Sequence, residues 1–462
     1  TIDGHVWLTS GSGGVRVRGA VQASNANGSG GTVTARANNI VVSGKVSASA
    51  TSTHGDGGSV SLIAKDTTKL SGRLSAKGGA QGGGGFVETS GEHVKIADRA
   101  KVSTLGKVGM TGEWLVDPND FTIAASGGDI TGAALSSELG TTDVTIASDD
   151  GATSGNGDIF VNDAVNWSGA HSLTLNAQRN IDVNANVTVA GSGGLSLNTG
   201  LGGSGNLDFA LGAGRVVFTN VTSGNDTALT INGQAYTLEN TLGDLAAAIT
   251  AAPTGFFALA GNYDAAADGT YSGAPISTVF SGTLEGLGNA VSNISVSQTQ
   301  SSSNLGGLLS TLGTLSTPGY VRDLLIKTAN LTIAGGNAYA GGLTSQLVSG
   351  AVSNVAVAGT LTVAGDGQTA GGLVGLVGDG GVITGSSATV RIDMPSGQSG
   401  NIGGLVGKST GSISTSFATG TITSEAGSNS VGGLVGTLSS GAAISGSWSS
   451  AKIFGTSGNN GG

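Results

Sequence analysis

The chain has 462 residues and contains no cysteine. Without thiols it forms no disulfides, holds no metal through thiolates and has no cysteine nucleophile. Proline occurs only five times, which excludes collagen and proline-rich linkers. No run of 18 apolar residues is present, so the sequence predicts no insertion into a membrane.

Charged residues are scarce as well, at 10% of the chain, and the formal net charge is −10. No contiguous block of Lys and Arg occurs, so we expect no binding to nucleic acid or to an anionic membrane surface. Hydrophobic residues nevertheless make up 38% of the chain. Because Val, Ile, Leu and Thr recur regularly along it, the sequence predicts a folded protein and not a disordered one.

Glycine is abundant, with 86 residues, and it marks a repeat in the first quarter of the chain. Gly-Gly-x-Val begins at Gly30, Gly57 and Gly84, so the copies start at equal intervals along the sequence. Within each repeat, apolar residues alternate in short runs bounded by Gly, Asn and Ser. This pattern predicts strands with one buried face, two or three in each repeat.

A second repeat, Gly-Gly-Leu-Val-Gly, occupies the last third of the chain. Weaker copies start at Gly306 and Gly341, and successive starts of all five copies are 35, 30, 32 and 29 residues apart. We expect the glycines to allow tight turns and each Leu-Val pair to lie in the core. The three full copies consist of Gly371, Gly372, Leu373, Val374, Gly375, Gly403, Gly404, Leu405, Val406, Gly407, Gly432, Gly433, Leu434, Val435 and Gly436.

Repeats of this length predict stacked units that bury their apolar faces against their neighbours. The fold class is therefore all-β, a parallel β-helix or β-solenoid, with about 17 coils at about 27 residues per coil. We expect β-helix coils of this length over 1–115 and further coils over 116–225. An excursion or cap is expected over 226–282, with a short helix at 242–249, and the Gly-Gly-Leu-Val-Gly coils over 283–462.

Acidic residues are the first candidates for chemistry, because enzymes on β-helices use clusters of carboxylates, sometimes with calcium. However, Asp beside Gly or Asn commonly caps a turn, and we favour that interpretation here. The run from Asp149 and Asp150 to Asp158 lacks the ligand spacing of an EF-hand loop. The candidate carboxylates are Asp117, Asp120, Asp149, Asp150, Asp158 and Asp163.

The four histidines, His5, His54, His93 and His171, lie in different predicted coils, and none is three or four residues from another. This spacing predicts no metal site. No Gly-x-Ser-x-Gly has a strand-to-helix context with a histidine partner, and no Gly-Lys-Ser/Thr phosphate loop occurs. The sequence therefore predicts no catalytic residue, no metal and no cofactor, and it identifies no ligand-binding residue.

The copies at 371–375, 403–407 and 432–436 resemble the GLUG motif of large bacterial surface proteins. Residues 85–91 and 112–123 resemble exoproteins of the filamentous-haemagglutinin type. Together they are similar to two-partner-secretion exoproteins, most of all to biofilm-matrix adhesins of the CdrA type. This resemblance implies a right-handed β-helix, an outer-membrane secretion partner and an extracellular location, at the bacterial surface or in the biofilm matrix. The chain begins without Met and ends within repeat-like sequence, so we expect it to be a fragment.

The favoured function is a rigid rod that links cells to one another or to exopolysaccharide through many weak sites, without enzymatic activity. One alternative is a polysaccharide lyase or hydrolase on the same fold, which would need acids and a base on one face. Another is a binder of a specific host protein that uses the helix at 242–249 as its contact. Composition alone does not separate these, because a fold does not determine a function.

Overall fold

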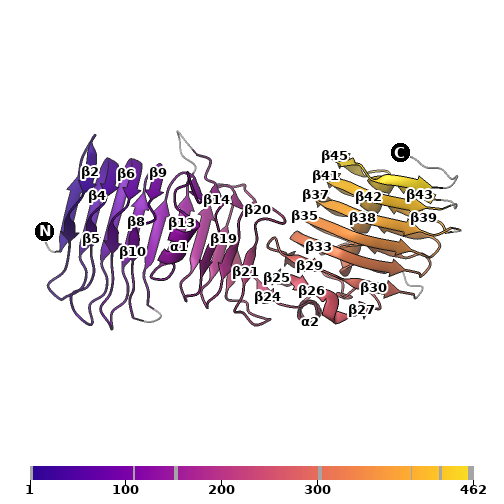
Figure 1. Cartoon of the computed structure of the whole chain (residues 1–462), viewed down its shortest axis with the longest axis horizontal. Coiled ribbons are helices and arrows are strands. Elements are labelled where there is room, and N and C mark those ends of the chain that lie inside the picture. Colours follow the sequence, from indigo (N-terminus) through magenta and orange to yellow (C-terminus); the bar gives the residue numbers. More distant parts are fainter. Residues whose placement is uncertain are drawn as a thin grey trace. The chain divides into compact units, whose positions relative to one another are not determined.

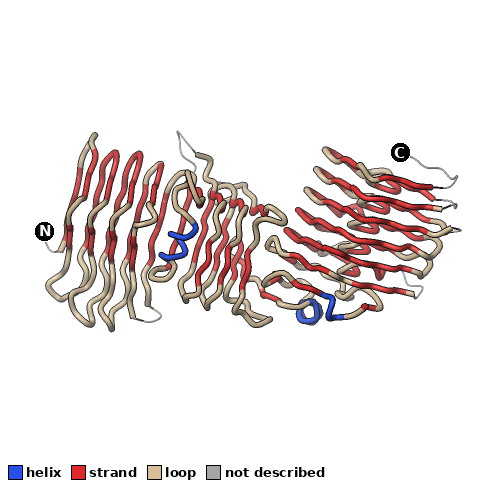
Figure 2. The backbone as a smooth tube through the Cα atoms, in the orientation of Figure 1, coloured by secondary structure: helices blue, strands red, loops and turns tan. Residues whose placement is uncertain are grey.

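The chain folds as a parallel β-solenoid, which confirms the predicted fold class. The computed structural model describes residues 4–107, 110–149, 155–299, 304–396, 398–425 and 429–455. Strands make up 52% and helices 5%, in about 14 turns and with two short helices. Figure 2 shows the strands as repeated rows with loops at the corners.

The difference in residue number between paired residues of neighbouring strands gives the length of each coil. His5 pairs with Thr32, Thr32 with Ser59, and Ser59 with Phe86, so the first coils have the same length as the Gly-Gly-x-Val repeat. Coil length then varies: the pairing of Leu173 with Leu195 gives a shorter coil, and the pairing of Leu309 with Thr344 gives a longer one. The prediction of about 17 coils was therefore wrong, since it assumed one coil length throughout.

The chain divides into two compact units. The first comprises Thr1–Val221 with Thr227–Ala235, and the second Thr222–Asp226 with Tyr236–Gly462. The expected boundary between 225 and 226 lies in the stretch 222–235, where short segments of the two units alternate along the sequence. Across the expected boundary at 115–116, β11 (Glu113–Asp117) pairs with both β8 (Phe86–Ser90) and β13 (Asp143–Ser148), so both groups of coils belong to the first unit (Figure 1).

The first unit contains one 12-stranded sheet, two four-stranded sheets and one three-stranded sheet. Its strands are β1 (His5–Thr9), β2 (Gly14–Val17), β3 (Ala20–Gln22), β4 (Thr32–Val42), β5 (Lys45–Ser47), β6 (Ser59–Leu70), β7 (Arg73–Ser75), β8 (Phe86–Ser90), β9 (His93–Ile96), β10 (Lys101–Ser103), β11 (Glu113–Asp117), β12 (Phe121–Ile123), β13 (Asp143–Ser148), β14 (Ile159–Val161), β15 (Val165–Trp167), β16 (Leu173–Ala177), β17 (Ile181–Val183), β18 (Val187–Val189), β19 (Leu195–Asn198), β20 (Leu207–Phe209), β21 (Val216–Phe218), β22 (Leu229–Ile231) and β23 (Gln234–Ala235).

Equivalent residues of successive coils form continuous columns in the core of this unit. Val33, Val60, Val87 and Trp114 are paired in series, and each is fully buried. The Trp114 indole N–H has a partner in the core, since it donates to the Thr89 hydroxyl at 3.1 Å. Alternation with a period of two, as read from the sequence, is what places these residues on one side of the sheet.

Helix α1 (Gly132–Glu138) was not predicted, and it lies between β10 and β15 where a strand would otherwise continue the stack. Polar side chains of α1 accept hydrogen bonds from backbone N–H groups of β10 and β15 that a neighbouring strand would otherwise accept. The Glu138 carboxylate accepts from the Val102 N–H of β10, and the Ser136 hydroxyl oxygen accepts from the Asn166 N–H of β15. The helix therefore joins two sheets without leaving these N–H groups unpaired.

The second unit consists of a 19-stranded sheet and a five-stranded sheet. Its strands are β24 (Thr237–Glu239), β25 (Phe256–Leu259), β26 (Tyr263–Asp264), β27 (Thr270–Tyr271), β28 (Thr283–Glu285), β29 (Ala290–Ser292), β30 (Ser295–Gln298), β31 (Asn304–Gly306), β32 (Leu309–Leu312), β33 (Gly319–Ile333), β34 (Tyr339–Gly341), β35 (Thr344–Val363), β36 (Gln368–Gly371), β37 (Val374–Thr384), β38 (Ser387–Met394), β39 (Gly400–Gly403), β40 (Val406–Ser409), β41 (Ser412–Ser414), β42 (Phe417–Ser424), β43 (Asn429–Gly432), β44 (Val435–Leu438), β45 (Ala443–Ser445), β46 (Trp448–Ser449) and β47 (Lys452–Gly455).

The helix predicted at 242–249 is confirmed as α2 (Leu242–Ala251) and is followed by a 3₁₀ helix, η1 (Ala265–Asp268). Leu242, Leu245 and Ile249 are buried in the same apolar cluster as the strands of the second unit. Helix α2 therefore covers the core of the first coils of that unit, where β25 pairs with β28.

We expect Leu62→Ala to destabilise the first unit, because Leu62 is fully buried in a core column of β6. Removing a buried leucine side chain typically costs about 2–5 kcal/mol of unfolding free energy. Leu201→Ala is the matched control, since the Leu201 side chain is 56% exposed. Chemical denaturation followed by tryptophan fluorescence measures both variants. Equal losses in the two variants would contradict the assignment of Leu62 to the core.

Candidate functional surfaces

The Gly-Gly-Leu-Val-Gly motif forms one corner of the later coils in the second unit, where it joins β36 to β37 and β39 to β40. Leu373 and Leu405 are fully buried, and the Leu373 N–H donates to the Leu405 carbonyl at 2.9 Å. A β-carbon on Gly404 would lie 2.1 Å from the carbonyl oxygen of Gly433, so the corner has no room for a larger residue. Copies of the motif in successive coils thus pack against one another, and the motif is a structural element of the fold.

The motif spacing read from the sequence equals the coil length measured by strand pairing. Leu309 pairs with Thr344, Thr344 with Val374, and Val374 with Val406, which reproduces the intervals between the motif copies. Residues 371–375 and 403–407 are buried throughout. Residues 432–436 are only half-buried, because they belong to the last described coils.

Polar side chains on the outer surface repeat from coil to coil and hydrogen bond to their equivalents. Hydroxyl and amide groups at matching positions of two neighbouring coils lie 2.8–3.1 Å apart. Both units carry such pairs. The pairs are Asn162–Asn184, Asn176–Asn198, Asn330–Thr360 and Thr389–Thr419.

Three of the candidate carboxylates bind backbone groups or a cation within the fold. The Asp120 carboxylate accepts from the N–H groups of Asn156 and Asp158, at 2.9 Å each. Asp158 pairs with Arg179, whose hydrogen bond lowers the pKa of that carboxyl. Asp163 accepts from the first turn of α1 at 2.8 Å. Asp120 and Asp163 thus cap backbone N–H groups, and Asp158 forms an ion pair. Asp150, the second residue of the acidic run from Asp149 to Asp158, lies outside the described residues.

Asp117 differs from these carboxylates. Burial, and then the nearby Asp149 and Glu88 carboxylates, raise the pKa of Asp117 to about 6. Asp149 accepts a hydrogen bond from the Gln178 amide at 3.0 Å, and Glu88 accepts one from the Ser90 hydroxyl. A carboxyl group that titrates in this range can donate a proton near neutral pH. Asp117 is therefore the side chain on which an enzymatic alternative would rest.

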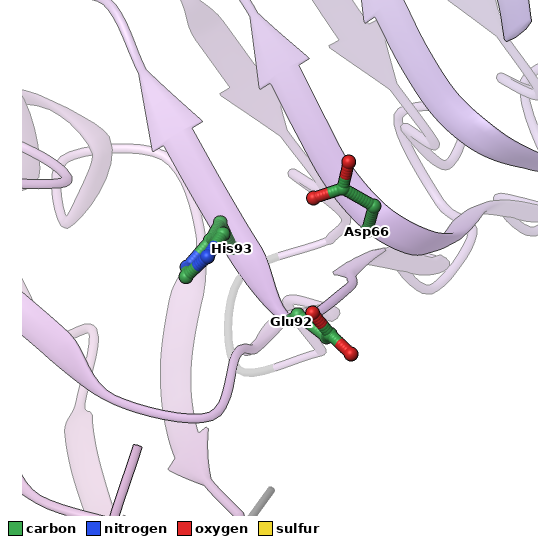
Figure 3. Close-up of side chains that lie close together, drawn as sticks. All are labelled: Asp66, Glu92 and His93. Atoms are coloured by element: carbon green, nitrogen blue, oxygen red, sulfur yellow. The ribbon is translucent and has the colours of Figure 1, made fainter. Parts of the chain in front are cut away.

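His93 lies near two acidic side chains, a proximity that the sequence analysis did not predict. Ligand atoms of His93, Asp66 and Glu92 all lie within 4.8 Å of one another (Figure 3). The signal was present in the sequence, since His93 follows Asp66 by the length of one Gly-Gly-x-Val repeat. The Asp66 carboxylate accepts from the Thr67 hydroxyl, and exposed acidic groups of this kind are common without a metal. We assign no metal to this cluster.

The second unit holds a buried acidic pair close to its first coils. Glu285 and Asp323 are almost fully buried, and the Arg322 Nε lies 3.7 Å from a Glu285 oxygen. Burial, and then Asp323, raise the pKa of Glu285 well above its usual value, so Glu285 keeps its proton and hydrogen bonds to Asp323. The Asn354 amide donates to Asp323 at 2.6 Å. This network stabilises the stacking of coils, and both of its carboxyl groups are turned away from solvent.

The described residues form grooves on the outer surface, of which one lies in each unit. One, of about 310 Å³, is lined by Thr9, Arg36, Ile63 and Lys65 in the first unit. The other, of about 480 Å³, lies in the second unit. Its lining includes Leu315, Val348, Leu376, Asp379 and Thr410.

Comparison with known proteins agrees with this architecture. Residues 366–393 and 398–423 match the family model of the GLUG motif. Neither a curated protein nor a solved structure matches the chain. The matched residues lie in the second unit, and these findings fit a GLUG-repeat β-helical protein, a kind of protein that is typically extracellular. Neither described helix has the length and apolar character needed to cross a bilayer.

We expect Asp117 to make the stability of the first unit depend on pH. Its pKa is about 6 in the folded chain against 3.8 unfolded, so the unfolded state loses the proton first as pH rises. The contribution of Asp117 to stability is therefore fully present below about pH 4 and is lost as pH rises to about 6. Thermal unfolding of Asp117→Asn should show a smaller loss over this range than the original chain, whereas Glu113→Gln on the same strand should match it. Parallel pH profiles for Asp117→Asn and the original chain would contradict this assignment.

Proposed function

We propose that the chain is a segment of an extracellular bacterial adhesin that binds polysaccharide and joins cells to one another or to a biofilm matrix. The observation that carries this proposal is the pairing of outward hydroxyl and amide groups between neighbouring coils in both units. These groups donate to and accept from sugar hydroxyls. The match to the GLUG motif supports an extracellular, adhesin-like protein.

Multivalency supplies the binding strength in this proposal. Each site is weak, because a few hydroxyl groups in water gain little net free energy on binding a sugar. Linking many sites on one scaffold raises the effective concentration of the second and later sites, so that avidity can exceed single-site affinity by about 10²–10⁴. The paired strands of each unit hold these sites at fixed spacing of about 4.8 Å.

The proposed route to the cell surface rests on the sequence resemblance. The segments 85–91 and 112–123, which resemble exoproteins of the filamentous-haemagglutinin type, form β8, β11 and β12 of the first unit. We propose secretion through an outer-membrane partner and residence at the cell surface or in the matrix.

The host-protein alternative receives little support from α2. Its apolar residues Leu242, Leu245 and Ile249 face the core, and its exposed residues include only small or polar ones such as Gly243 and Asp244. Protein interfaces usually depend on buried aromatic or long side chains. Helix α2 is better explained as a cover for the coils beneath it.

We predict that binding strengthens with the length of the sugar polymer. The test is to immobilise the purified chain and measure its affinity for matrix polysaccharide and for size-fractionated fragments of it. Longer fragments should bind more tightly by one or more orders of magnitude. Equal affinity for the shortest and longest fragments would contradict multivalent binding.

The same samples test the enzymatic alternative, which depends on Asp117. Polymer length is measured by size-exclusion chromatography before and after prolonged incubation. We expect no shortening. Shortening that disappears in Asp117→Asn would replace the adhesin proposal with a lyase or hydrolase.

A further inference from the structure

The net charge of −10 conceals an uneven distribution along the chain. Residues 1–107 contain twelve of the 19 Lys and Arg but only six of the 29 Asp and Glu. This stretch therefore carries a formal charge of +6, and the remainder, with seven cations and 23 acids, carries −16. The first coils are basic in a chain that is otherwise strongly acidic.

Strand pairing arranges these cations in columns. Lys45, Arg73 and Lys101 occupy equivalent positions on β5, β7 and β10, and each is exposed. On the neighbouring face, Lys69 of β6 pairs with Lys95 of β9, and both are exposed. Successive members of a column lie about 4.8 Å apart, the distance between neighbouring strands.

A tight glycine corner brings the two columns together. Gly44 and Gly72 precede Lys45 and Arg73, and a β-carbon on Gly72 would lie 2.0 Å from the Gly44 carbonyl oxygen. Only Ser71 and Gly72 separate the end of β6 from β7, so cations on both faces border one edge of the coils. We call this surface the basic corner. It comprises Arg16, Arg18, Lys45, Lys69, Arg73, Lys95, Arg99 and Lys101.

Most of the basic corner lacks acidic partners. Lys95 pairs with Asp129 at 2.7 Å, and Lys101 pairs with Glu138 at 3.3 Å, both at the end nearest α1. Within the described residues, the other six cations make no ion pair. Asp98 is the acid nearest in sequence to this corner, and its carboxylate accepts a hydrogen bond from the Thr131 hydroxyl. Lys45, Lys69 and Arg73 therefore leave positive charge open to solvent over the first coils.

We infer that the basic corner binds an acidic polysaccharide, in which each sugar or each short repeat carries a carboxylate. This inference rests on the proposed function and names the class of polymer. A polyuronate is an extended chain of regularly spaced negative charges, and a pyranose residue is comparable in length to the ~4.8 Å between coils. A column of cations with this spacing can meet successive carboxylates without bending the polymer. The acidic remainder of the chain would repel the same polymer.

Nucleic acid is the other polyanion to consider, and the surface fits it less well. Proteins that bind single strands place aromatic side chains where bases can stack. The strands that carry cations of the basic corner, β2, β5, β6, β7, β9 and β10, contain no Phe, Trp or Tyr. Duplex DNA carries one phosphate per about 3.4 Å of helix axis on each strand, and its phosphates wind around that axis and do not lie in a straight column. DNA is therefore included in the test as a competing ligand.

The test measures binding of the chain to polygalacturonate, to neutral dextran and to duplex DNA. The basic-corner variant carries Lys45→Gln, Lys69→Gln and Arg73→Gln. The matched control carries Lys327→Gln, Arg391→Gln and Lys408→Gln, which removes the same charge from the second unit. We expect the first variant to bind polygalacturonate roughly tenfold or more weakly, and the control to match the original chain. Binding should also weaken at high salt, where the screening length falls from about 10 Å at 0.1 M to about 3 Å at 1 M.

The other outcomes are distinguishable. Equal losses in both variants would show that only net charge matters and would overturn the basic corner as a site. Tighter binding of DNA than of polygalacturonate, lost in the first variant, would overturn the class of polymer. Binding to dextran alone would overturn this inference and leave the proposed function intact. Failure to bind any polysaccharide would contradict both. Circular dichroism of the variants verifies their folding.

Discussion

Parallel stacking of coils in register is the constraint on which the rest of this structure depends. Backbone hydrogen bonds run from each coil to the next, so each residue lies beside its equivalent about 4.8 Å away. A side chain at one position of a coil must therefore pack against the side chains at the equivalent positions of the neighbouring coils. Hence Val33, Val60 and Val87 form a core column, and Gly404 lies against Gly433 where no β-carbon fits. Interruptions are compensated locally, as when Glu138 accepts the hydrogen bond that a missing strand would have taken.

The same constraint produces surfaces suited to polymers and not to small substrates. An outward hydroxyl in one coil is followed by another in the next, as with Thr389 and Thr419 at 2.8 Å. A regular polymer presents its own groups at regular intervals, so a column of weak contacts can be matched along its length. Charge follows the same rule, since cations placed one coil apart become a continuous basic column. Carboxylates such as Asp120 and Asp163 are meanwhile used to cap turns.

Features with a fixed period were predictable from sequence. The spacing of Gly30, Gly57 and Gly84 predicted the coil length, and apolar spacing predicted α2. Helix α1 was missed because it is short and follows a stretch of strand-like alternation. The basic corner was missed because its cations are never contiguous. Lys45, Arg73 and Lys101 lie a full coil apart in sequence, so they form a group only when the sequence is aligned by coil. The buried pair of Glu285 and Asp323 has no periodic signal at all.

The most direct measurement of register in the stack uses the absence of native cysteine. Thr389→Cys and Thr419→Cys place two thiols on outward positions that are paired between β38 and β42. A short thiol cross-linker should join this pair rapidly and leave the protein folded. It should join Thr389→Cys with Thr421→Cys far more slowly, because Thr421 pairs with Arg391 instead. Equal cross-linking of the two pairs, or a preference for the second, would contradict the parallel in-register coil.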